Sequence, residues 1–105
     1  MEIIEHYSTR QSWESMVAID GHQVLVRAEP GYGVSMGTPK HIKFVATADR
    51  EKIYPQEVRA TNKVAKVELP ILDMTFPLSL GEIERYMSIL EHVSSAAISL
   101  ARADV

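Results

Sequence analysis

Residues 13–28 read WESMVAIDGHQVLVRA, two alternating apolar and polar runs that meet at Asp20-Gly21. Asp-Gly commonly centres a two-residue hairpin turn, because glycine accepts a positive φ freely and aspartate tolerates one. Folding the chain at this dipeptide predicts four pairs on one mostly apolar face: Trp13 with Ala28, Ser15 with Val26, Val17 with Val24, and Ile19 with His22. The other face gains Met16 opposite Leu25, and Glu14 opposite Arg27 as a cross-strand ion pair. A shift by one residue would scatter this pattern, so the sequence specifies the register.

Further strands are predicted on both sides of this hairpin. They are expected at Glu2–Tyr7, Ile42–Ala48, an irregular edge segment at Glu57–Thr61, and Val64–Leu69, where Pro70 is expected to end the strand. Residues 30–41, PGYGVSMGTPKH, contain three glycines and two prolines and are expected to form a loop. Pro55 argues against a continuous helix, and residues 49–61 are left open between strand and short helix.

The C-terminal part of the chain predicts one long helix within residues 79–103, after a connector at 70–78. Ser79 and Glu82 have the spacing of a capping box, and Arg102 in the last turn suits the helix dipole. We therefore expect the helix to run from about Leu80 to Arg102. The predicted fold class is α+β: an antiparallel sheet of about five to six strands packed against this helix.

The apolar surface of this predicted helix exceeds what one sheet normally covers. At 100° per residue, apolar side chains fill roughly 200° of the circumference, whereas contact with a sheet needs somewhat more than 100°. A helix of this length extends about 35 Å and a seven-residue strand about 23 Å. The small-residue end, from Ser94 to Ala101, is therefore expected to project past the sheet.

This surplus surface predicts a homodimer formed through the helix. One flank, around Ile83, Met87, Leu90 and Ile98, is expected to pack on the sheet, although the two flanks can exchange roles. The candidate interface on the other flank consists of Tyr86, Ile89, Val93, Ala96 and Leu100. A Val93→Asp change would then give a monomer with an intact helix. The alternative is a monomer in which the sheet curls around the helix and residues 70–78 cover its second flank.

Charge is unevenly distributed along the chain, although the net value is only −3. Residues 40–66 carry seven basic and three acidic residues, for +4, while the segments before and after carry −3 and −4. An anion-binding face would use Lys40, Lys43, Arg59, Lys63 and Lys66. The plainer interpretation is a solvated sheet whose lysines discourage edge-to-edge pairing. The negative net charge and the lack of interleaved aromatic residues disfavour a nucleic-acid partner.

Composition and motifs limit the other classes of function. With 105 residues the chain is expected to be a single domain, 1–105, and it contains no cysteine. Neither a signal peptide nor a membrane-length apolar run is visible, which predicts a cytoplasmic protein without membrane contact. The four histidines lack metal-ligand spacing, and no nucleophile motif occurs, so neither an enzyme nor a metal or cofactor site is expected. A small-molecule site over the glycine-rich loop 30–41 remains an alternative, although a phosphate loop would have to open a helix.

The leading hypothesis is therefore a small interaction or regulatory protein without catalytic activity. It would act as a homodimer and bind an unidentified protein partner. Sheets followed by a capped helix recur in many small bacterial and phage accessory proteins, and such a fold does not by itself assign a function.

Overall fold

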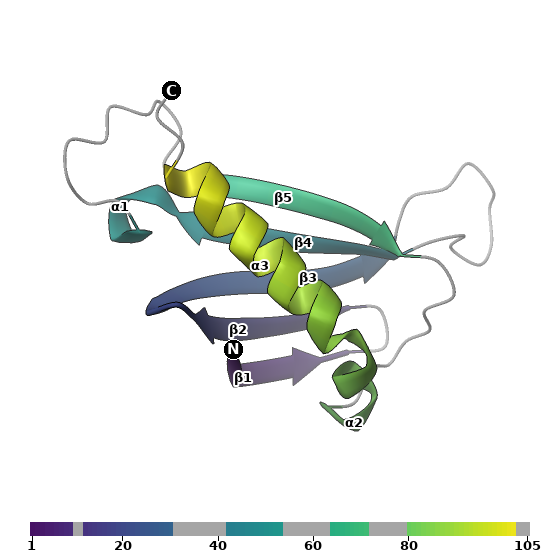
Figure 1. Ribbon diagram of the computed structural model, residues 1–105. Coiled ribbons are helices and arrows are strands. Elements are labelled where there is room, and N and C mark those ends of the chain that lie inside the picture. Colours follow the sequence, from purple (N-terminus) through teal and green to yellow (C-terminus); the bar gives the residue numbers. More distant parts are fainter. Residues whose placement is uncertain (10–11, 31–41, 54–63, 72–79, 103–105) are drawn as a thin grey trace.

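The computed structural model describes residues 1–9, 12–30, 42–53, 64–71 and 80–102. The elements are β1 (Glu2–Ser8), β2 (Trp13–Ile19), β3 (His22–Pro30), β4 (Ile42–Asp49), α1 (Arg50–Ile53), β5 (Val64–Ile71), α2 (Leu80–Ile83), a 3₁₀ turn (Glu84–Tyr86) and α3 (Met87–Arg102). The strands form one antiparallel sheet in the order β1-β2-β3-β4-β5, and α3 lies diagonally across one face (Figure 1). The predicted α+β fold is confirmed.

The β2–β3 hairpin has the predicted register. All seven pairs from Trp13–Ala28 to Ile19–His22 are present. Asp20 and Gly21 have φ values of 51° and 78°, the positive angles that a type I′ turn requires. The Arg27 Nε atom lies 3.8 Å from Glu14 Oε2, so the predicted ion pair also forms.

Strand β1 contains an irregularity that the sequence pattern did not predict. Its pairing with β2 shifts between Ile3 and Glu5, which leaves Ile4 as the extra residue of a bulge. The Ser15 hydroxyl donates a hydrogen bond of 2.6 Å to the Glu5 carbonyl oxygen beside this bulge. Ser15 is buried, so this bond provides a partner for a hydroxyl that would otherwise be unpaired.

Two expected strand ends were wrong. Strand β3 includes Pro30, and β5 continues through Pro70 to Ile71. Proline lacks the amide hydrogen needed for a second ladder, but an edge strand uses only one of its two sides. Pro70 lies on the edge strand β5, opposite Lys43 of β4. The open question about residues 49–61 is answered in part by α1, and the predicted strand at 57–61 lies outside the described residues.

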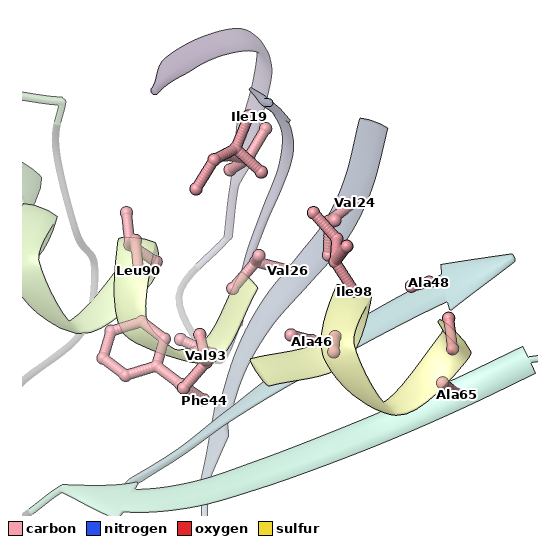
Figure 2. Packing of buried hydrophobic residues seen from close by; sticks show 14 of the residues in the cluster. Ile19, Val24, Val26, Phe44, Ala46, Ala48, Ala65, Leu90, Val93 and Ile98 are labelled. Carbon is pink, nitrogen blue, oxygen red and sulfur yellow. The ribbon is translucent and has the colours of Figure 1, made fainter. Parts of the chain in front are cut away.

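The core lies between α3 and one face of the sheet, here called the covered face. Leu90 and Val93 of α3 lie near Phe44, and Ile98 lies near Val24 (Figure 2). The Trp13 and Phe44 rings meet edge to face at 6.3 Å. In β2, β3 and β4, every second side chain points to the covered face, and nearly all of these side chains are buried. This arrangement accounts for the alternation in the sequence.

The helical region from Leu80 to Arg102 has the predicted limits, but it is not one regular helix. A 3₁₀ turn separates α2 from α3. Side chains three residues apart align in such a turn. This geometry suits Ile83, which is buried, and Tyr86, whose ring centroid lies 6.2 Å from that of Phe44. Ser79 and the Glu82 side chain, which form the predicted capping box, lie outside the described parts.

The small-residue end of α3 packs on the sheet and does not project past it as expected. Ser94, Ala97 and Ala101 are buried. Ala46, Ala48 and Ala65 lie on the covered face below this end of the helix (Figure 2). The buried surface between α3 and the sheet is therefore made of small side chains on both sides at this end. The Arg102 Nη2 atom donates to Nε2 of His22 at 2.7 Å, which joins the end of α3 to the start of β3.

Candidate protein-interaction surface

The face of the sheet that points away from α3 is here called the open face. No element among the described residues packs against it (Figure 1). The register places these side chains on it: Glu2, Glu5 and Tyr7 of β1; Glu14, Met16 and Ala18 of β2; Gln23, Leu25, Arg27 and Glu29 of β3; Lys43, Val45, Thr47 and Asp49 of β4; Val64, Lys66, Glu68 and Pro70 of β5. Within the described parts of the chain, this face of the sheet therefore has no helix or strand packed on it.

One row across the open face has a charged residue at each end and two apolar residues and a threonine between them. Cross-strand pairing places Glu5, Met16, Leu25, Thr47 and Lys66 side by side from β1 to β5. The two outer residues are exposed, and the three inner ones are half-buried. An apolar centre with a polar border is the usual anatomy of a protein–protein contact surface.

Val45 is the most enclosed residue of the open face, with 3% of its surface exposed. It lies between Arg27 and Glu68 of the neighbouring strands. Long charged side chains commonly cover apolar neighbours with their methylene groups. Val45 thus contributes little exposed surface to the open face, although it lies in the row next to that of Leu25 and Thr47.

Charged groups beside Val45 pair with one another. The Glu68 Oε1 atom lies 3.2 Å from Lys66 Nζ, and its Oε2 atom lies 3.6 Å from Lys43 Nζ. The hydrogen bond from Lys66, followed by the positive charges of Lys43 and Lys66, lowers the pKa of the Glu68 carboxyl below its usual value of 4.5. The carboxylate therefore offsets part of the positive charge of both lysines.

This arrangement bears on the predicted anion-binding residues. Only Lys43 and Lys66 of that set fall within the described residues, and they come together on the open face. Lys40, Arg59 and Lys63 lie outside the described parts. Because Lys43 and Lys66 share Glu68, the described geometry gives little support to an anion or nucleic-acid site.

The predicted helix interface requires a correction at Val93. This side chain is fully buried between α3 and the sheet, so it offers no surface to a second chain. Tyr86 and Ile89 are partly buried against the same core, and Ala96 is also partly buried. Only Leu100 of the five is well exposed, at 41%. The diagonal path of α3 over a sheet with small side chains uses most of the surplus apolar surface.

The open face also contains a shallow depression over β1 and β2. It has a volume of about 170 Å3 and is lined by Glu5, His6, Tyr7, Glu14, Ser15, Met16 and Leu25. Sites for drug-sized ligands commonly occupy 300–1,000 Å3. The depression is thus smaller than a typical site for a drug-sized ligand, and the glycine-rich loop proposed for a small-molecule site falls outside the described parts.

Metal binding and membrane insertion were also considered for the described residues. Within these ranges, no three His, Asp or Glu side chains gather closely enough to hold a metal ion. No helix there is long and apolar enough to cross a membrane.

Sequence reasoning missed the open face as a surface, although its signal was present. The pattern had already placed Met16 and Leu25 on the face opposite Val17 and Val24. What the pattern lacked was the order of the strands, which brings Thr47 and Lys66 into the same row.

Similarity to known proteins was sought at three levels. The chain matches no protein-family model, no curated protein and no solved structure.

Proposed function

We propose that this chain is a non-enzymatic protein that acts through protein–protein contacts, with the open face as its contact surface. The observation that supports the proposal is the row of Met16, Leu25 and Thr47, bordered by Glu5 and Lys66. A partner that covered this row would bury apolar side chains and leave the charged groups at the rim, where ion pairs confer specificity.

The covered face supports the same assignment by contrast. Its apolar side chains are already covered within the chain, because Phe44, Val26 and Ala46 are completely buried beneath α3. The outer side of α3 carries Glu91, His92 and Ser99, all exposed. Such a polar surface gains less from association than the open face does, so the open face replaces the helix flank as the favoured contact surface.

A photo-crosslinking experiment tests this proposal in the cells that produce the protein. The photoreactive residue p-benzoylphenylalanine would replace Thr47 on the open face or, as the matched control, Ser99 on the outer side of α3. With the photoreactive residue at position 47, light should produce covalent adducts between this chain and another protein chain. With the photoreactive residue at position 99, few such adducts should form. A Leu25→Asp change in the same chain should remove the adducts. Adducts from position 99 alone, or from neither position, would contradict the proposed surface.

A further inference from the structure

We propose that the partner of the open face is a second copy of this chain, bound face to face about a twofold axis that runs along β3. This inference rests on the proposed function, because it names the partner of the same surface. Closed twofold dimers are the commonest assemblies of identical chains. The resulting dimer would have four layers, with the two sheets inside and an α3 helix on each outer side.

The strand order determines which residues such an axis brings together. β3 is the central strand of the sheet (Figure 1). A twofold axis that runs parallel to β3 between two facing sheets reverses the strand order of the second sheet. Each residue keeps its position along the strand direction. β1 of each copy then faces β5 of the other, β2 faces β4, and β3 faces β3.

The central row complements itself under this operation. Glu5 of each copy meets Lys66 of the other, which forms two opposite-charge pairs per dimer. Met16 meets Thr47, and Leu25 meets its own counterpart on the axis. Facing sheets lie about 10 Å apart, a gap that Glu and Lys side chains can span together. The row thus places apolar groups at the centre and complementary charges at both ends.

The distribution of carboxylates separates this axis from the other face-to-face arrangement. The β1–β2 half of the open face contributes three carboxylates and no basic residue among the described side chains: Glu2, Glu5 and Glu14. Lys43 and Lys66 lie on the β4–β5 half, beside Glu68 and Asp49. An axis across the strands would stack the acidic halves of both copies. The axis along β3 places each acidic half against the half that contains the lysines.

The neighbouring row is compatible with the same axis. Arg27 meets its own counterpart there, and like charges would repel each other. Each Arg27 already lies 3.8 Å from Glu14 of its own chain. The two carboxylates flank the two guanidinium groups on either side of the axis, so positive and negative charges alternate across it.

Sedimentation velocity of the purified full chain, together with charge reversals, tests the proposal. The natural sequence should dimerise. Glu5→Lys and Lys66→Glu should each weaken dimerisation by about 10- to 100-fold, because each replaces two attractive pairs with two repulsive ones. An equimolar mixture of these two variants should form a heterodimer of nearly natural affinity, since every facing pair is again of opposite charge. The control Glu91→Lys changes an exposed charge on α3 and should leave dimerisation unchanged.

The double variant Glu5→Lys/Lys66→Glu provides the same test within one chain and should dimerise like the natural sequence. Circular dichroism melting would show that each variant is folded. A natural chain that stays monomeric at the highest accessible concentration would overturn the proposal. So would a folded variant pair that does not associate when mixed. If either result is obtained, a crosslinked adduct between position 47 and a different protein would still support the proposed function. If position 47 gives no adduct, the proposed function and the proposed dimer are both wrong.

Discussion

The two faces of this sheet are built from the same strands and differ in what their side chains meet. On the covered face, residues such as Val26 and Ala46 are fully buried under α3. On the open face, Leu25 and Thr47 are their direct neighbours in sequence and are only half-buried. Alternation along a strand therefore separates two environments: one face provides stability through packing, and on the other no described element covers the side chains.

The largest change in the free energy of unfolding should come from placing a carboxylate beneath α3, on the covered side of the sheet. Val93→Asp would put a carboxylate into the core and remove a buried valine, at a cost of about 4 kcal/mol or more. Domains are commonly stable by about 5–15 kcal/mol, so much of the stability would be lost. Urea unfolding followed by circular dichroism would measure this change.

Leu25→Asp is the matched change on the open face. It should remove association and cost much less stability than Val93→Asp, namely the part that dimerisation contributes at the concentration used. The dimer predicted from the helix flank alone leads to the opposite expectation, a folded monomer from Val93→Asp. A folded, stable Val93→Asp protein would therefore show that the comparison between the faces is wrong.

A smaller effect is expected where α3 approaches the sheet. Ala46→Leu would add bulk below α3, where Ala46 is fully buried, and should cost about 1–3 kcal/mol through overpacking. Ala18→Leu adds the same atoms on the open face, where Ala18 is only partly buried, and should cost much less. Thermal unfolding of both variants would check the difference. Equal losses would mean that the open face is as tightly packed as the covered one.

The smallest effect concerns the ion pairs of Glu68 and the pH. The pKa of this carboxyl is lowered in the folded chain, chiefly by the hydrogen bond from Lys66. A lowered folded-state pKa gives stability that is present above the unfolded value and is lost as the pH falls through the folded value. Glu68→Gln should therefore reduce the melting temperature slightly at neutral pH. The difference should vanish in acid, below the usual value of 4.5. A difference that grows in acid would contradict this sign.

Local signals in the sequence were enough to predict the five strands of the sheet, the C-terminal helical region and one register. The alternation around Asp20-Gly21 fixed all seven pairs of β2 and β3, and the apolar periodicity predicted helix up to Arg102. Both signals depend on residues close in sequence, where turn geometry and the helical repeat act directly.

Features that depend on distant segments were not predictable in this way. Ala46 and Ala65 of the sheet share one buried cluster with Ala97 and Ala101 of α3, and no local pattern relates the two pairs. Pro70 is tolerated because β5 is an edge strand, a property of the strand order. The strand order also assembles the candidate contact surface on the open face. For this reason the sequence alone predicted a contact surface on the helix flank.

In the proposed arrangement, the chain associates through the open face and not through the outer side of α3. Methyl NMR spectra of the natural chain over a range of concentrations would test it most directly. The methyl signals of Met16 and Leu25 should shift as the concentration rises, while that of Leu100, exposed on α3, should stay in place. Shifts confined to Leu100, or signals that do not change at any concentration, would contradict the account.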